Sequence, residues 1–197
     1  MSGITTGIVL FDGAEELDFA GPWEVFTMGR REGDRVVTIA EHDRPIVCAK
    51  GMRVLADHTF ADAPALDVLL VPGGRGRKVE RTNPAMLDYL RAAAPGCTWV
   101  TSVCTGAFVL DGAGLLGDRR VTTHWASVPE LREAAPHLEV LEHTRYVRDG
   151  NVVTAAGVSA GIDMALWLLG QLTSVEHARR TQYLMEYDPA PPYSALA

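Results

Sequence analysis

A cysteine stands where a strand-like segment gives way to small residues, in the stretch WVTSVCTGA at residues 99–107. The run at 98–103 predicts a strand and residues 105–112 predict a helix, so Cys104 would lie at the sharp turn between them. The first N–H groups of a helix lack partners within the helix, and this position is expected to favour the nucleophilic thiolate. The alternative interpretation is a small, buried, unreactive side chain.

Two glycines, Gly73 and Gly74, follow a second buried run at residues 67–71. Neighbouring parallel strands open at their carboxyl ends onto one crevice, so this turn is expected beside Cys104. The backbone N–H groups of Gly74 and Thr105 would then form an oxyanion hole with two donors. The alternative is a tight turn that uses glycine only for its backbone freedom.

Asp18 lies in the stretch EELDFAGP at residues 15–22, after an expected strand at 4–11 and before an expected helix at 22–30. This placement assigns its carboxyl group to the same crevice. Apolar residues flank Asp18 on both sides, and partial desolvation would raise its pKa and make it a proton donor. The alternative is an acidic residue that interacts with a helix dipole.

His124, in the stretch TTHW at residues 122–125, is the strongest candidate among six histidines. It is expected at a strand end, where it would accept a proton from Cys104 or orient a substrate. A purely structural hydrogen-bonding role is the alternative. The basic run RGRKVER at 75–81 would attract an anionic substrate or form a solvated loop, and it lacks the Gly-Lys-Ser/Thr of a phosphate-binding loop.

Strand-like and helix-like segments alternate along the chain, which predicts an α/β fold with an open, mostly parallel sheet and helices on both faces. The pair Asp149-Gly150 predicts a hairpin between strands at 146–148 and 152–155. Lys50-Gly51 predicts a hairpin or edge excursion between strands at 46–49 and 52–56. Further strands are expected at 35–40, 121–124 and 138–142, and further helices at 84–94, 127–135, 160–172 and 174–187.

Composition narrows the class of protein. The chain has 197 residues, 47% apolar and 22% charged, which fits one globular domain over 1–197. A formal charge of -7 argues against nucleic-acid binding. There is no apolar run of membrane-spanning length and no secretory leader pattern, so a cytoplasmic location is expected. Cys48, Cys97 and Cys104 are too few and too irregularly spaced for a disulfide framework or a zinc site, and no metal is expected.

Taken together, these motifs resemble the ThiJ/PfpI superfamily. The resemblance spans nearly the whole chain. Within the superfamily the chain most resembles the isocyanide (isonitrile) hydratases, although sensor domains of AraC-like transcription regulators share the pattern. It is carried by LDFAGP at 17–22, VPGG at 71–74, TSVCTG at 101–106, GLL at 114–116, TTHW at 122–125 and GVSAGID at 157–163.

The resemblance implies a glutamine-amidotransferase-like, flavodoxin-like sandwich whose nucleophile is Cys104, with Asp18 as its acidic partner. Backbone donors at Gly74 and Thr105 would stabilise charge, with Gly73 and His124 as auxiliary groups. Peptidase members carry His directly after the cysteine, whereas this chain has Thr105.

The implied activity is that of a lyase which converts an isocyanide and water to an N-substituted formamide through a covalent thioimidate on Cys104. It needs no cofactor, takes a small-molecule substrate, and is expected in a homodimer, with apolar segments near residues 18–28 at the interface. Phe19, Trp23, Trp125 and Tyr193 are candidates for an apolar substrate pocket.

Two other classes of function stay open at this point. One is a ligand-sensing module, but no basic helix-turn-helix segment is apparent. The other is a cysteine enzyme that acts on reactive carbonyls, or a redox-responsive protein in which Cys104 is oxidised.

Overall fold

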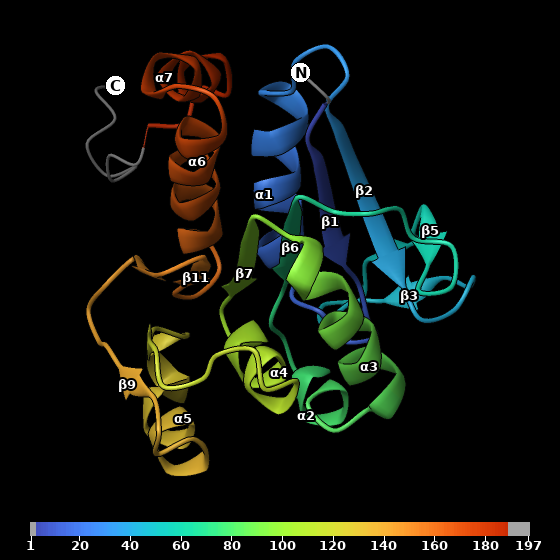
Figure 1. The fold of residues 1–197 in the computed structure, drawn as a ribbon, viewed down its shortest axis with the longest axis vertical. Coiled ribbons are helices and arrows are strands. Elements are labelled where there is room, and N and C mark those ends of the chain that lie inside the picture. Colours follow the sequence, from blue (N-terminus) through green and yellow to red (C-terminus); the bar gives the residue numbers. More distant parts are fainter. Residues whose placement is uncertain (1–2, 189–197) are drawn as a thin grey trace.

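A seven-stranded sheet runs through the part of the chain that the computed structural model describes, residues 3–188. The strand order is β10-β11-β7-β6-β1-β2-β5, and every neighbouring pair is parallel except β10 with β11. The predicted open, mostly parallel sheet is therefore confirmed (Figure 1). Its strands are β1 (Thr5–Val9), β2 (Arg35–Ala40), β5 (His58–Thr59), β6 (Val68–Val71), β7 (Trp99–Val103), β10 (Tyr146–Asp149) and β11 (Val152–Ala155).

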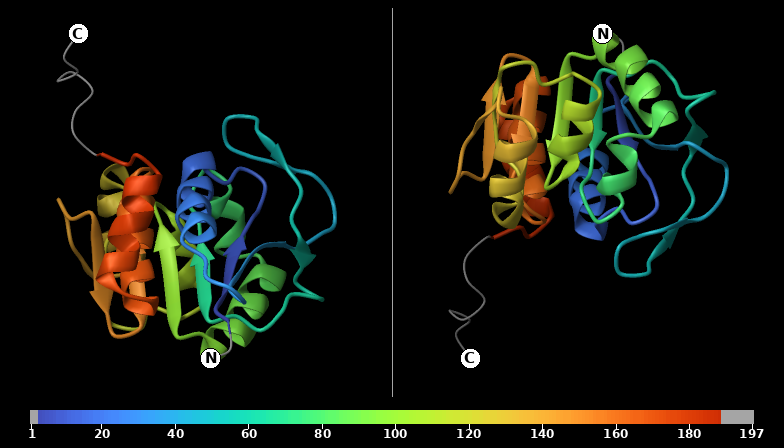
Figure 2. Two further views of the ribbon diagram at one scale, coloured as in Figure 1. Left: turned by 90° about the horizontal axis from the view of Figure 1, so that it is seen from above. Right: turned by 90° about the horizontal axis from the view of Figure 1, so that it is seen from below.

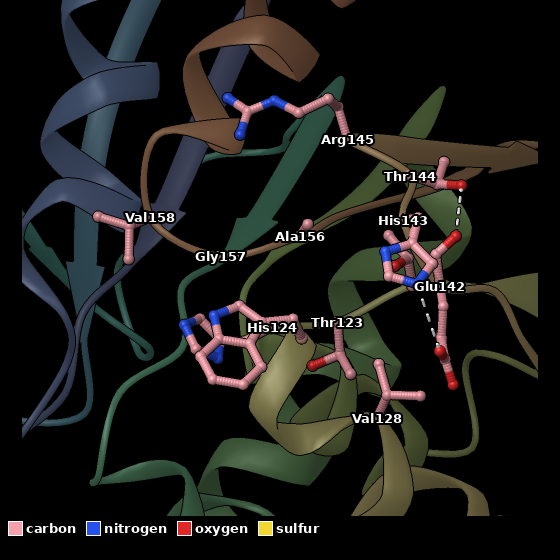
Figure 3. A pocket seen from close by; sticks show the side chains of 12 residues that line it. Thr123, His124, Val128, Glu142, His143, Thr144, Arg145, Ala156, Gly157 and Val158 are labelled. Atoms are coloured by element: carbon pink, nitrogen blue, oxygen red, sulfur yellow. Dashed lines mark hydrogen bonds and ion pairs between the residues drawn. The ribbon is translucent and has the colours of Figure 1, made fainter.

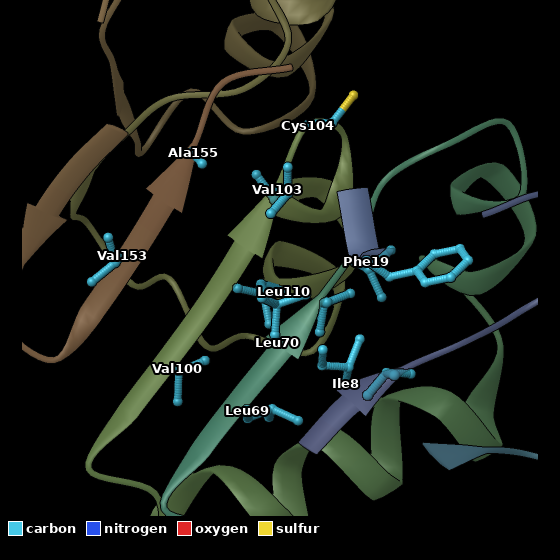
Figure 4. Close-up of a cluster of buried hydrophobic side chains, with 14 of the residues drawn as sticks. Ile8, Phe19, Leu69, Leu70, Val100, Val103, Cys104, Leu110, Val153 and Ala155 are labelled. Carbon is cyan, nitrogen blue, oxygen red and sulfur yellow. The ribbon is translucent and has the colours of Figure 1, made fainter. Parts of the chain in front are cut away.

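The central strands are almost entirely buried because helices cover both faces of the sheet. All four residues of β6 and of β11 are buried, as are the last four of β1 and of β7. Figure 4 shows their side chains packed together below Cys104, which stands at the end of β7. This core fixes the strand ends from which the site is built.

Helices lie on both faces of the sheet, as the sequence predicts (Figure 2). On one face α1 packs against α6, and α6 packs against α7. On the other face α4 contacts α2, α3 and the strands β6 and β7. The helices are α1 (Glu16–Met28), α2 (Arg77–Glu80), α3 (Pro84–Ala93), α4 (Gly106–Gly112), α5 (Val128–Ala134), α6 (Ala160–Leu172) and α7 (Val175–Leu184), with 3-10 turns η1 (Ala94–Gly96) and η2 (Trp125–Ser127).

Two small excursions leave the main sheet. The predicted hairpin around Gly51 forms as β3 (Ile46–Val47) and β4 (Arg53–Val54), which pair only with each other. β8 (Arg120–Val121) and β9 (Glu139–Val140) form a parallel pair beside α5. The hairpin predicted at Gly150 joins β10 to β11, and its left-handed φ of 61° is readily adopted by glycine.

The strand order reverses between β1 and β6. The chain passes from β1 to β2 and β5 on one side, then returns to β6, β7 and β11 on the other. Ligands of open α/β sheets bind at such a switch point, outside the carboxyl ends of the strands. A binding site is therefore expected at the segments that follow β1, β6, β7 and β11.

Several predicted boundaries are wrong. Helix α1 begins at Glu16, six residues before Pro22, so Asp18 lies in its first turn and not before the helix. A proline often marks the first residue of a helix, but Pro22 lies inside α1. The strand expected at 121–124 ends at Val121 and lies outside the main sheet, and β5 and α2 were not predicted. No helix within residues 3–188 is both long enough and apolar enough to cross a membrane.

Candidate active site

Cys104 occupies the turn between β7 and α4 in a left-handed conformation, with φ of 55°. A side chain other than glycine pays a conformational cost there, and such strain is common at nucleophile turns. The conformation is held on both sides. The Cys104 N–H donates to the carbonyls of Ala155 and Ala156, at 3.1 and 3.0 Å, and the Thr123 hydroxyl donates to the Cys104 carbonyl at 2.8 Å.

The glycine turn after β6 lies directly against the Cys104 turn, as predicted. A Cβ atom on Gly73 would stand 2.4 Å from the Thr105 nitrogen and 2.9 Å from the Cys104 Cβ. A Cβ on Gly106 would stand 2.2 Å from the Val71 carbonyl oxygen. These two positions accept only glycine because the two backbones touch.

Asp18 enters the same place from the first turn of α1. Its side chain is fully buried, and its Oδ2 accepts the Gly73 N–H at 2.9 Å. The carboxyl group also interacts with the Cys104 thiol and the Val158 N–H. Its other oxygen, Oδ1, is buried without a hydrogen bond of good geometry to any described residue. Such an oxygen is costly unless a bound molecule contacts it.

The surroundings of Asp18 raise its pKa from 3.8 to about 7. Burial is the largest cause, and the negative charge of Glu15 adds to it, whereas the Gly73 N–H acts in the opposite direction. Glu15 is itself held in place, because its side chain forms an ion pair with Lys50 and its N–H donates to the Gly73 carbonyl at 2.9 Å. The predicted upward shift of the Asp18 pKa is confirmed.

The thiol of Cys104 departs from expectation. Burial and the neighbouring Asp18 carboxyl raise its pKa to about 12. The N–H and hydroxyl of Thr105 lower the pKa, as the turn geometry predicts, but desolvation outweighs them. The expectation that this position favours the thiolate is therefore wrong. The Thr105 groups at the start of α4 lower the pKa of Cys104 by less than burial and the Asp18 charge raise it. The resting cysteine is a thiol.

The two expected oxyanion donors are both occupied. The Gly74 N–H donates to the Thr105 hydroxyl at 3.0 Å, and that hydroxyl approaches the Gly74 carbonyl at 3.3 Å. The Thr105 N–H interacts with the Cys104 sulfur. Gly74 is thus not a free donor in this structure, because the side chain of Thr105 reaches it first. Its φ of 116° and its bridge to Ala14 show that it also serves the turn.

His124 lies near the site without joining Cys104. No hydrogen bond connects the two within residues 3–188; instead His124 caps η2, where its Nδ1 accepts the Ala126 N–H at 3.2 Å. In the neutral ring the proton therefore resides on Nε2. Its ring packs so closely on Gly157 that a Cβ there would lie 2.1 Å from the ring. His124 is therefore not placed to act as a base on Cys104.

A cavity of about 670 Å³ opens beside this histidine (Figure 3). Its volume suits a small organic molecule. Trp125, one of the predicted pocket residues, contributes to its lining, whereas Phe19 is buried in the core and Trp23 packs against the core. Tyr193 lies outside the described residues.

The basic run at 75–81 is more ordered than expected. Arg77 is 5% exposed, pairs with Glu130 of α5 and lies over the Phe108 ring, with 3.9 Å between the guanidinium carbon and the ring centroid. Arg77 therefore lies in helix α2 with its charge paired, whereas Arg75 and Lys78 of the same run are exposed.

Sequence reasoning missed two groups at the site. Val158 has a left-handed φ of 54° and directs its N–H to Asp18, which no residue pattern foretells for a β-branched side chain. Glu15 raises the Asp18 pKa, and the adjacent acidic residues of the stretch EELD were a signal for it. Within residues 3–188, no cluster of three or more His, Cys, Asp or Glu side chains is arranged to hold a metal ion.

The sequence of this chain is similar to those of several known proteins. Residues 6–171 match the model of the DJ-1/PfpI family. An isonitrile hydratase of Pseudomonas putida is 38% identical over 96% of this chain and 81% of its own length. The transcriptional regulator GlxA of Rhizobium meliloti is 41% identical over 74% of this chain, but only 45% of that protein is matched.

Solved structures agree with the family match. A ThiJ/PfpI family protein from Pseudomonas syringae superposes with a TM-score of 0.90 at 30% identity, over 100% of this chain and 80% of that one. Drosophila melanogaster DJ-1beta shares the fold, with a TM-score of 0.83 at 22% identity over 95% of this chain and 100% of that one.

Proposed function

This chain belongs to the DJ-1/PfpI family, and on that premise we propose that it is an isonitrile hydratase, which converts R–N≡C and water to R–NH–CHO. The observation that carries the proposal is the buried pair of Cys104 and Asp18, a nucleophile and a proton carrier in direct interaction at the switch point of the sheet. The hydratase of Pseudomonas putida supplies the reaction class.

The first step uses one proton shared by the pair. Asp18, as carboxylate, takes the proton of the Cys104 thiol, and the sulfur attacks the terminal carbon of the isonitrile. Asp18 then delivers this proton to the same carbon, which gives a thioimidate, Cys104–S–CH=N–R. A carboxyl group with a pKa of about 7 suits both halves of this transfer near neutral pH.

Water completes the reaction. Asp18 takes a proton from water as the water oxygen adds to the thioimidate carbon, and the nitrogen receives that proton. The tetrahedral adduct R–NH–CH(OH)–S–Cys104 then collapses: the C–S bond breaks, the hydroxyl proton passes to Asp18, and R–NH–CHO leaves. The pair has regained its single proton, and no metal or organic cofactor enters the balance.

Backbone groups have supporting roles in this proposal. The Thr105 N–H, which interacts with the sulfur, stabilises negative charge on it. The Gly73 N–H holds Asp18, and the Gly74 N–H holds the Thr105 hydroxyl. Gly74 would donate to an oxyanion only after the Thr105 side chain turns away. His124 acts on the substrate side of the cavity and not on Cys104.

The test is formamide production from phenyl isocyanide and from methyl isocyanide, followed by absorbance and mass spectrometry. The native protein is expected to turn over both, and Cys104→Ala to lose at least a thousandfold in kcat. Because loss of one proton from the pair creates the reactive state, kcat/KM should rise with pH through about 7.

Cys97→Ala is a matched control for Cys104→Ala. Cys97 is also buried and precedes the same strand, β7, at its opposite end, where its thiol donates to the Ala93 carbonyl. This variant should keep its activity. Full activity in Cys104→Ala, or no formamide from either isocyanide with folded native protein, rejects the hydratase.

A ligand-sensing role is the second candidate, favoured by the similarity to GlxA, a transcriptional regulator. A sensor would bind a small molecule in the cavity without turnover. A redox-responsive role fits less well, because the raised pKa of Cys104 keeps little thiolate at neutral pH for oxidation. Turnover of methylglyoxal would instead identify a carbonyl-processing enzyme.

The protein's partners and location are also part of the proposal. We propose a homodimer with a small-molecule substrate and no nucleic-acid partner, the last supported by the formal charge of -7. A cytoplasmic location is supported by three free, buried cysteines, which suit a reducing compartment. Cell fractionation tests the location.

A further inference from the structure

The cavity beside the site shares a wall with the catalytic pair. The backbone of residues 156–158 lines it, and the same backbone contacts both groups. The Ala156 carbonyl accepts the Cys104 N–H at 3.0 Å, and the Val158 N–H interacts with Asp18. The cavity and the catalytic pair are therefore separated by one backbone segment, residues 156–158.

An aromatic surface is exposed in this cavity. Trp125 is 79% exposed although its indole is a large apolar group, and its only ring partner among the described residues is His124, at 5.6 Å between centroids. Val128 and Val158 add aliphatic surface to the lining (Figure 3). A flat apolar group bound here would cover the indole and gain both burial and ring contact.

The charged groups of the cavity are already paired. The Arg145 guanidinium forms an ion pair with Asp163, with 2.6 Å between Nε and Oδ2, and also donates to the Ser159 hydroxyl. Glu142 is paired with Arg132. The remaining titratable side chains in the lining are His124, whose Nδ1 is hydrogen-bonded, and His143, whose side chain is 95% exposed. The carboxylate and the guanidinium that line the cavity are therefore both paired, and neither is free to bind a charged substituent.

We propose that this cavity receives the substituent R of the isonitrile and selects neutral aromatic substituents over small or anionic ones, with Trp125 as the residue that determines this preference. The inference rests on the proposed hydratase activity and deepens it. The isocyano carbon is then directed to Cys104, while the ring lies between Trp125 and the backbone of residues 156–158.

Three substrates of graded size and charge test the preference: methyl isocyanide, phenyl isocyanide and 4-isocyanobenzoate. The kcat/KM of phenyl isocyanide should exceed that of methyl isocyanide by tenfold or more, because the ring buries apolar area against the indole. The kcat/KM of the anionic substrate should fall at least tenfold below that of phenyl isocyanide, because its carboxylate loses hydration beside a guanidinium, Arg145, whose charge Asp163 already balances.

Trp125→Ala tests the residue. The ratio of kcat/KM for phenyl over methyl isocyanide should fall about tenfold, mostly through KM, and Trp125→Phe should restore most of the ratio. Tyr183→Ala, which removes an 81% exposed ring from α7 outside the cavity lining, is the matched control and should keep the native ratio.

The possible failures are distinguishable. Turnover of methyl isocyanide with no preference for the phenyl compound, or an unchanged ratio in Trp125→Ala, keeps the hydratase and overturns the assignment of the cavity. Absence of turnover with all three substrates in the folded native protein overturns the hydratase and this inference together.

Discussion

Asp18 combines two properties at the residue scale that oppose one another. Its carboxyl group has a pKa of about 7 because it is buried near Glu15, so the fold holds a proton that the unfolded chain would release. The proposed chemistry, in contrast, needs the carboxylate that accepts the Cys104 proton. Stability and activity are therefore expected to change in opposite directions as pH rises toward 7.

Replacement of Asp18 by a residue that does not ionise should show how much stability the buried carboxylate costs. Between pH 4 and 7 the folded state binds more protons than the unfolded state, so the free energy of unfolding falls as pH rises and levels off above 7. Asp18→Asn has no such slope. The stability of the variant relative to the native protein should increase by about 3 kcal/mol from pH 5 to pH 8, measured by urea unfolding.

Glu24→Gln removes an exposed carboxyl group from the same helix and serves as the control. Its stability relative to the native protein should be nearly independent of pH over this range. An Asp18→Asn variant that tracks the native protein equally well at both pH values would show that the carboxyl titrates as in the unfolded chain.

What the sequence predicts at this scale is residue identity more than protonation state. The segments between strands and helices indicate Cys104, Asp18, Gly73 and Thr105, and the structure brings these four residues together. The predicted direction of the Cys104 pKa shift is wrong, because this pKa depends on burial, which arises from tertiary packing. The left-handed backbone of Val158 was not predictable for the same reason.

At the scale of elements, the site depends on the contact between two turns, which follow β6 and β7. The N–H of Gly73 holds Asp18, and its missing side chain leaves room for Thr105 and Cys104. The sequence predicted this contact because both turns end buried strands. The sequence does not predict the start of α1, because Pro22 is typical of a first helical position, whereas the helix begins at Glu16 and passes through this proline.

Gly73→Ala should separate the two turns. The added methyl would meet the Thr105 nitrogen at 2.4 Å, so the backbone must shift, and a loss of about 2 kcal/mol or more in the free energy of unfolding is expected together with loss of turnover. Urea unfolding and formamide assays measure the two effects.

Gly96→Ala is the comparison for this change. Gly96 ends η1, and a Cβ there would meet no atom within 4 Å, so this variant should be close to native in both stability and activity. If Gly73→Ala behaved like Gly96→Ala, the close contact of the two turns would not be needed for the site.

At the scale of the whole molecule, the α/β architecture was predictable because each central strand is a short run rich in Val, Ile and Thr that alternates with helix-like segments. The small pairs β3-β4 and β8-β9 and the short β5 were predicted less well, since two-residue strands depend on their partners more than on their own composition. A single domain over 1–197 and a homodimer both stay predictions.

Dimerisation can be tested on α1. Leu17 and Met28 are 38% and 40% exposed, and eleven positions amount to about three helical turns, so both lie on one face. Sedimentation should give twice the chain mass of 21.3 kDa, and Met28→Glu should shift the protein toward the monomer. Val79→Glu, at a 66% exposed position on α2, should not. A native protein that sediments at the chain mass would contradict the dimer.

The position of β1 in the middle of the sheet has a consequence for synthesis on the ribosome. During synthesis β1 can pair with β2 early but must wait for β6, and the turn carrying Cys104 must wait for Ala155 and Ala156 to hold it. Such distant pairings close slowly and cannot form on a partial chain. The candidate active site therefore cannot assemble on the ribosome until residues 155–158, which hold Cys104 and Asp18, have been translated.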